Sequence, residues 1–267
     1  MGTTHYQTEA KFTYTPMETT DHLREQRCYD EWISLQRLEL SELRDALTLS
    51  SEGRMSDADL TLLVEKMMDH IQDYCDKRKC LAHQDAATYL APNWCNALEN
   101  SGLWVGGRRP SVFIRLVYAL SGLDFESKLA EFLNGAEVED LSGISGVQVS
   151  KISELQSKTN RQEEKLSSKM ATLQEDMADQ QFASVANKPD RNCCLNEDAV
   201  AALKENGQSI ASLVEEADRM RLDTIKELIK RLTPVQAVQF LAASKKLRLC
   251  IKEWGEKQDH EHGRNAE

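Results

Sequence analysis

Apolar side chains recur at three- and four-residue steps along much of the chain, which is the spacing of one face of an α-helix. The first such stretch ends at the sequence Ser-Ser-Glu-Gly, residues 50–53. The second follows Ser56, and Asp59 three positions later gives an acidic variant of the capping box. We therefore predict two long amphipathic helices, the second reaching the 81–90 region. Their inward positions are Tyr29, Trp32, Ile33, Gln36, Leu40, Leu43 and Leu47, then Leu60, Leu63, Val64, Met67, Ile71, Tyr74 and Cys75.

Residues 90–120, LAPNWCNALENSGLWVGGRRPSVFIRLVYAL, interrupt this pattern. Pro92 and Pro110 each lie where a helix can begin, because the first helical turn has no amide bond to lose. Gly106 and Gly107 can adopt positive φ, so the chain can reverse tightly after Trp104. We predict a buried Trp/Gly-Gly/Pro elbow, followed by a short, mostly buried helix that ends at Gly122.

The following segments predict two further helices of different character. A short one is marked by apolar residues at 129–133, and a long polar one follows a loop at 143–146. The long one has a near-heptad apolar repeat, so a lone coiled coil and packing within a bundle are both open. An interruption at Thr159 and Gln162 favours the bundle.

Helical spacing returns from Val200 to Leu232, after a linker near 183–197. Thr233-Pro234 is a cap followed by a first-turn proline, which ends one helix and opens the next. We predict that this last helix stops at Gly255.

Long periodic segments and the absence of strand-like alternation predict an all-α fold. It is expected to be a helical bundle of long antiparallel helices, with short helices around the elbow. The predicted domain spans residues 24–255, between a mobile N-terminal lead-in at 1–23 and a frayed charged tail at 256–267.

Charge and cysteine content narrow the classes of function. A net charge of −11 argues against nonspecific nucleic-acid binding, which depends on lysine and arginine displacing counterions. Seven cysteines, an odd number without CxxC spacing, favour reduced thiols in the nucleus or cytoplasm over disulfides or a zinc site. Cys193 and Cys194 are adjacent in the predicted linker, where redox reactivity is an open alternative. No segment approaches the ~18 apolar residues of a membrane span.

Several residue groups could be taken for sites, and each has a simpler interpretation. The sequence GGRRP at 106–110 lacks the strand and the GK[ST] ending of a phosphate-binding loop. Glu65, Asp73 and Asp76 fit the solvated face of a helix better than an acid–base pair. The sequence therefore predicts no enzyme.

Four tryptophans are expected in the core, and seven basic residues form either one positive patch or scattered solvated charges. These sets are Trp32, Trp94, Trp104 and Trp254, and Lys226, Lys230, Arg231, Lys245, Lys246, Arg248 and Lys252.

Four stretches carry a resemblance to a known family. CYDEWISLQ at 28–36, the elbow, LQED at 173–176 and the segment 213–255 resemble the plant Delay of Germination domain. That domain also forms the C-terminal half of TGA-type basic leucine zipper factors. The resemblance spans roughly residues 25–256. It implies a noncatalytic role in seed dormancy, germination or abscisic-acid signalling, through type 2C protein phosphatases. The alternative is association with TGA-type factors, and a homodimer is also open.

Two departures limit what the resemblance implies. Residues 1–21 contain Lys11 as their only basic residue, whereas a zipper factor enters DNA with an Arg- and Lys-rich helix. DNA contact is therefore expected to be indirect at most. The family's founding germination regulator is described as binding haem through two histidines four residues apart. Arg248 and Lys252 occupy those positions here, and a protonated arginine has no lone pair for iron. We expect no haem cofactor.

The first helix offers a candidate partner-binding surface. Tyr29 and Trp32 share a face, so both can belong to the core, and a partly exposed Tyr29 is the alternative. The outward residues are then Arg27, Asp30, Glu31 and Ser34. Interface hot spots are enriched in arginine and aromatic residues. Arg27 and Tyr29 are therefore expected to contribute most to binding.

Overall fold

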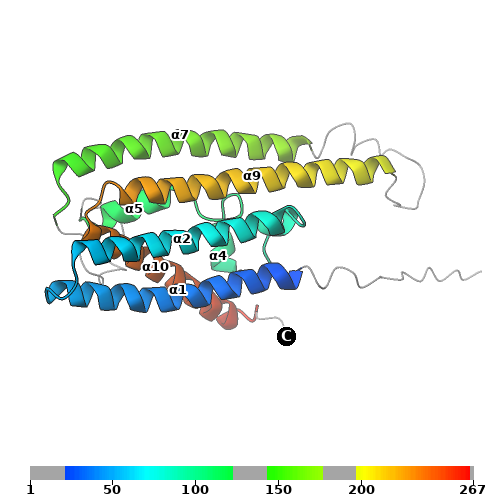
Figure 1. The fold of residues 1–267 in the computed structure, drawn as a ribbon. Helices are drawn as coiled ribbons and strands as arrows, with labels where there is room; N and C mark the ends of the chain where they lie inside the picture. Colours follow the sequence, from blue (N-terminus) through cyan, green and yellow to red (C-terminus); the bar gives the residue numbers. More distant parts are fainter. Residues whose placement is uncertain (1–21, 123–142, 177–196, 265–267) are drawn as a thin grey trace, which may run out of the picture.

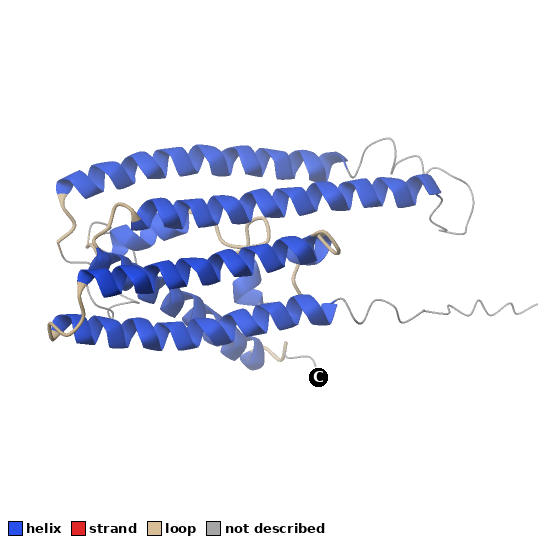
Figure 2. Cartoon of the chain, viewed as in Figure 1, coloured by secondary structure: helices blue, strands red, loops and turns tan. Residues whose placement is uncertain are grey.

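The structure is a computed structural model that describes residues 22–122, 143–176 and 197–264. Within these ranges the chain forms helices, with one isolated bridge between Trp104 and Gly107 and no strand (Figure 2). The predicted all-α fold is confirmed. The helices are α1 (His22–Ser51), α2 (Asp57–Ala82), α3 (Ala87–Leu90), α4 (Ala97–Ser101), α5 (Ser111–Leu120), α7 (Gly146–Asp176), α9 (Glu197–Ile229) and α10 (Pro234–Glu261).

Four long helices lie side by side in the order α7, α9, α2 and α1, each antiparallel to its neighbours (Figure 1). Behind this row, α10 packs across α1 and α2 and also contacts α4 and α5. Contacts of α7 with α9 and α5 place α7 in the bundle, as the interruption at Thr159 favoured. The last helix of the chain thus closes the core over the first two.

Local sequence fixes the starts of the long helices as predicted. Ser56 and Asp59 form a full capping box at α2, with the Ser56 backbone N–H donating to the Asp59 carboxylate at 3.0 Å. Thr233 and Gln236 form a second capping box at α10, where Pro234 occupies the first turn. Such caps bind amide groups that have no partner within the helix.

The core divides into two neighbouring clusters of apolar side chains. The larger joins α1, α2, α5, α7, α9 and α10, and Phe240 of α10 is among its fully buried members. The smaller lies at the elbow, around Tyr89, Trp104 and Val105, and is closed by α7 and α9. The elbow therefore fills one end of the bundle and does not project from it.

Two predicted helix boundaries are wrong. Pro92 begins no helix, since α4 starts at Ala97 with Asn96 as its N-cap. The last helix does not stop at Gly255 but continues to Glu261, so residues 256–261 are not part of a frayed tail. The reason is tertiary: a Cβ at Gly255 would overlap the Asn96 side chain, so glycine serves close packing here and not termination.

The predictions for the tryptophans are partly confirmed and partly wrong. Trp32 and Trp104 are buried as expected, but Trp254 is 46% exposed and is not a core anchor. The short helix at 129–133, the linker with Cys193 and Cys194, and the lead-in before His22 lie outside the described residues. The domain limits 24–255 stay a prediction. Within the described ranges no helix is long and apolar enough to cross a membrane.

Candidate functional site

The outer face of α1 carries four of the five predicted partner-binding residues. Arg27, Asp30, Glu31 and Ser34 are exposed and line a shallow groove with Leu35 and Leu38. The Glu31 side chain is held only weakly by the rest of the protein, because its ion pair with Lys77 spans 3.8 Å between two exposed side chains. Leu38 is 70% exposed, so one end of the groove is apolar, a feature that was not predicted from the sequence.

Tyr29 is the exception, and the expectation that it is partly exposed is wrong. Only 4% of Tyr29 is exposed, and its hydroxyl donates a hydrogen bond to the Glu99 carboxylate of α4. Burial raises the pKa of the phenol, and the Arg248 guanidinium opposes that shift. Tyr29 therefore attaches the elbow to α1 and does not belong to the exposed surface.

The elbow itself is a tight reversal, as predicted. The Trp104 amide donates to the Gly107 carbonyl at 2.6 Å, and the Gly107 amide returns a bond of 3.2 Å. Gly106 has a positive φ of 69°, and so does Val105, at 46°. Gly107 does not, but a Cβ there would lie 2.8 Å from the Arg221 guanidinium. The second glycine is thus needed for space and not for its backbone angle.

Two buried arginines from neighbouring helices stabilise this reversal by hydrogen bonds to its backbone carbonyl groups. Arg221 of α9 donates to the Arg108 carbonyl at 2.7 Å and the Val105 carbonyl at 2.9 Å. Arg78 of α2 donates to the Gly106 carbonyl at 2.7 Å. Asp218 lies between the two guanidinium groups, accepting bonds of 2.8 Å and 2.7 Å. This network was not predicted, although charged residues on the inward faces of α2 and α9 are a recognisable signal of buried polar contacts.

A cavity of about 150 Å³ lies between the elbow, α1, α2, α9 and α10. A second cavity of about 50 Å³ adjoins it, and both are lined by Tyr74, Arg78, Arg108 and Arg248. The remaining wall of the larger cavity is mostly apolar, with Phe113, Leu116, Ile225 and Phe240 among its residues. Burial lowers the pKa of Arg108, and the nearby Arg248 guanidinium lowers it further.

The two positions that correspond to the family's histidines lie beside this region. Arg248 lines both cavities, and Lys252 pairs with Glu256 at 2.7 Å. Both are cations, which repel a metal ion and do not ligate it. Across residues 22–122, 143–176 and 197–264, no group of three His, Cys, Asp or Glu side chains could hold a metal ion.

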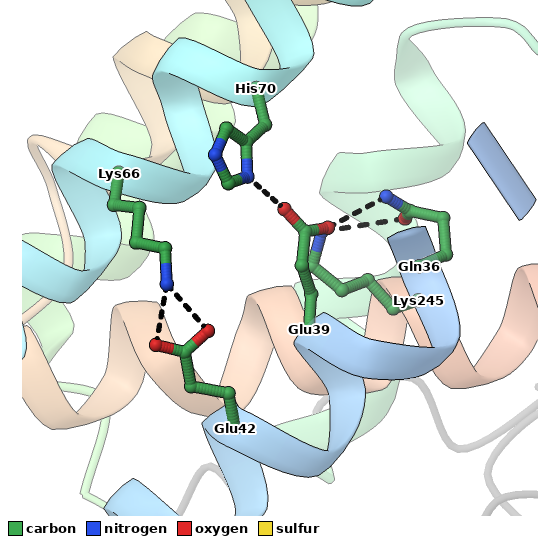
Figure 3. A network of polar contacts seen from close by, with 6 residues as sticks. All are labelled: Gln36, Glu39, Glu42, Lys66, His70 and Lys245. Atoms are coloured by element: carbon green, nitrogen blue, oxygen red, sulfur yellow. Dashed lines mark hydrogen bonds and ion pairs between the residues drawn. The ribbon is translucent and has the colours of Figure 1, made fainter. Parts of the chain in front are cut away.

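A buried ion pair next to the cavity joins three helices (Figure 3). Lys245 of α10 donates to Glu39 of α1 at 2.6 Å, and these side chains are 3% and 2% exposed. Gln36 and His70 complete the group, with contacts of 2.9 Å and 2.6 Å to the Glu39 oxygens. Burial lowers the pKa of Lys245, against the attraction of Glu39. Lys245 is therefore an interior residue and contributes to no positive surface patch.

Other basic residues have partners on or near their own helices. Lys230 and Arg231 both pair with Glu227 at 2.8 Å, and Lys226 donates to Gln72 at 3.3 Å. This arrangement supports the interpretation of scattered charges. On α2, Glu65, Asp73 and Asp76 are exposed, as expected of a solvated face.

Cysteine reactivity is expected to report how closed the elbow region is. Burial raises the pKa of Cys75 to about 12 and that of Cys95 to about 11, whereas Cys80 is exposed on α2. Because the thiolate is the reacting form, iodoacetamide at pH 8 should modify Cys75 and Cys95 at least about 100-fold more slowly than Cys80. Mass spectrometry of timed digests measures the three rates. Comparable rates would show that the elbow opens readily in solution.

Comparison with known proteins places the chain in a family. The model for the DOG1 family, described as seed dormancy control, matches residues 39–119, from the middle of α1 almost to the end of α5. Protein DOG1-like 3 of Arabidopsis thaliana is 37% identical over 237 residues, covering 85% of this chain and 82% of the relative. Protein DOG1-like 1 of the same plant is 36% identical, covering 88% and 90%.

More distant relatives share the same region. Protein RESPONSE TO ABA AND SALT 1 is 24% identical over 84% of this chain and 91% of its own length. Transcription factor TGA7 is 25% identical over 80% of this chain but only 51% of its own length. Both proteins are from Arabidopsis thaliana. Since relatives above 35% identity align along most of both sequences, the chain belongs to the DOG1 family of seed dormancy control proteins.

Proposed function

We propose that this protein is a noncatalytic plant regulator of seed dormancy and germination, or of abscisic-acid-type signalling, that acts by binding another protein. The observation that carries the proposal is the outer face of α1, where exposed charged residues and an exposed leucine line the same groove. The family model and the name of the relative RESPONSE TO ABA AND SALT 1 support the biological setting. The family resemblance supports a type 2C protein phosphatase as the partner.

The face has the composition of a small interface. Leu35 and Leu38 supply an apolar part, and Arg27, Asp30 and Glu31 supply a polar part next to it, and interfaces combine both kinds of surface. The opposite side of α1 is packed in the core, so the helix is held in place before a partner arrives. A preorganised surface loses less conformational entropy on binding, which favours affinity.

Changing this face is expected to reduce phosphatase capture. Arg27→Ala plus Glu31→Ala removes one charge of each sign from exposed positions, and Leu38→Ser removes the most exposed apolar side chain of the groove. Each variant should retain about a tenth or less of the wild-type affinity, as is typical for loss of an interface hot spot. The measurement is a pull-down with a panel of type 2C phosphatases, followed by titration of those captured.

Glu164→Ala plus Lys165→Ala provides the matched control. Both residues are exposed on α7, at the far side of the row of long helices (Figure 1). Their replacement also removes one acidic and one basic side chain. Circular dichroism should show equal helicity for all variants. If the wild-type protein captures no phosphatase, or the α1 variants capture as much as the control, this surface assignment is wrong.

A second candidate is association with a TGA-type transcription factor. The match to TGA7 covers most of this chain, so the two proteins share this helical unit, and related units commonly pair. In this candidate the chain contacts DNA only through its partner. Affinity purification from seed tissue distinguishes the two functions by recovering either phosphatases or zipper factors. Light scattering of the purified protein determines whether two copies associate.

A further inference from the structure

The cavity between the elbow and α10 has more positive than negative charge around it. Five cationic side chains lie at its walls or next to them, and three carboxylates face them, which leaves a net charge of 5 − 3 = +2. The cations are Arg78, Arg108, Arg221, Lys245 and Arg248, and the carboxylates are Glu39, Glu99 and Asp218. Excess charge of one sign in a largely desolvated region is unfavourable unless a counter-ion compensates it.

The excess is concentrated on Arg108 and Arg248. The Nε of Arg248 is completely enclosed and has no hydrogen-bond acceptor among the described residues. The Arg108 guanidinium likewise makes no hydrogen bond or ion pair within the described ranges, although its backbone carbonyl accepts from Arg221. The two guanidinium groups are near enough for Arg248 to lower the pKa of Arg108.

Neighbouring carboxylates are already engaged. Glu99 accepts from the Tyr29 hydroxyl, and its other oxygen accepts from the Asn96 amide groups at 3.3 Å and 2.8 Å. Asp218 is shared by Arg78 and Arg221. Glu99 attracts Arg108 electrostatically, but within the described ranges no acid forms a hydrogen bond or an ion pair with the guanidinium of Arg108 or Arg248.

The opposite end of the cavity suits an apolar group. Phe113, Leu116 and Phe240 line it, and the volume of about 150 Å³ equals that of an engineered cavity that holds benzene. The adjoining 50 Å³ beside Arg108 and Arg248 offers room for a small charged group. One end thus fits a ring and the other an anion.

We propose that this cavity is a binding site for a compact organic acid, with its carboxylate between Arg108 and Arg248 and its apolar body against Phe113, Leu116 and Phe240. A carboxylate matches the planar donor geometry of guanidinium groups and would bind the unpaired donors of both. An inorganic anion would satisfy the charge but leave the apolar part of the cavity empty. The inference is independent of the proposed protein partner, because its test uses the purified chain alone.

Binding of benzoate, phenylacetate and cyclohexanecarboxylate to the full-length protein tests the proposal. Isothermal titration and thermal unfolding should show saturable binding of at least one acid at millimolar concentration or below. The neutral analogue of that acid, for example benzamide for benzoate, should bind at least about tenfold more weakly, because it lacks the charge-assisted bonds. This comparison needs no variant.

Arg108→Gln and Arg248→Gln should each weaken binding of the acid at least about tenfold. Without ligand, both variants should unfold at the wild-type temperature or above it, since each removes an uncompensated charge. Arg115→Gln, an exposed position on α5 with the same change in charge, should bind as the wild type does. The proposal is overturned if none of the acids binds up to 20 mM, as roughly 2 kcal/mol of affinity would suffice to detect them. Equal binding of acid and neutral analogue, equal binding of inorganic phosphate, or unchanged binding by both variants would also overturn it.

Discussion

Replacing Lys245 by methionine is expected to lower the free energy of unfolding by about 3–5 kcal/mol, the range for breaking a buried ion pair from one side. Methionine fills much of the same space, so the loss comes mainly from Glu39, which is 2% exposed and would lose its cationic partner. Gln36 and His70 would still contact Glu39, but neither replaces a full ammonium charge at 2.6 Å. Urea unfolding followed by circular dichroism measures the change.

Lys66→Met is the matched control, because Lys66 and Glu42 form an ion pair of 2.7 Å between α2 and α1 on the surface beside the buried group (Figure 3). Both of those side chains are largely solvated, so its loss should cost about 0–1 kcal/mol. Removing both buried charges, as in Glu39→Leu plus Lys245→Met, should recover most of the stability. A Lys245→Met protein as stable as the Lys66→Met protein would mean that Glu39 is not held charged in the interior.

Replacing Gly255 by alanine is expected to destabilise the protein by about 2–4 kcal/mol, combining overpacking with the loss of a helix cap. A Cβ at Gly255 would overlap the Asn96 side chain, which caps α4 and donates to the Lys252 carbonyl at 2.9 Å. Asn96 would have to move, and α4 would lose its cap and its attachment to α10. Thermal and urea unfolding both report the loss.

The same substitution at Gly207 should have the opposite sign. Gly207 lies inside α9, and an added Cβ there meets no atom within 4 Å. Alanine reduces the freedom of the unfolded chain and favours helix, so Gly207→Ala should stabilise by about 0.5–1 kcal/mol. If Gly255→Ala left stability unchanged or raised it as Gly207→Ala does, the close contact between α4 and α10 would not persist in solution.

Sequence patterning was sufficient for the parts of the fold that depend on local interactions. The capping boxes at Ser56 and Thr233 and the reversal after Trp104 involve residues three positions apart, so the sequence contains both partners in one short window. Gly255 shows the limit of such reasoning. A glycine near the end of an apolar stripe usually indicates a helix end, and only the approach of Asn96, far away in the sequence, reveals its other use.

The candidate sites also separate into residues that local patterning can place and contacts that form only between distant segments. Helical periodicity was enough to place Arg27, Asp30, Glu31 and Ser34 on the exposed face of α1. It also put Tyr29 among the inward positions, but it could not show the partner of its hydroxyl, Glu99, which is 70 residues away. The cationic cavity was missed for the same reason, because its arginines come from α2, the elbow, α9 and α10 and meet only in the folded chain.

The packing of α10 across α1 has a consequence for how the protein is made. About 180 residues separate the end of α1 at Ser51 from the start of α10 at Pro234, so a ribosome needs roughly 10–40 s to synthesise them. During that interval α1 has emerged without Phe240 and Lys245, the residues that cover its apolar side and neutralise Glu39. A helix of this kind is only marginally stable alone in water. Nascent chains therefore expose part of the apolar side of α1 until α10 has been synthesised and has packed against it.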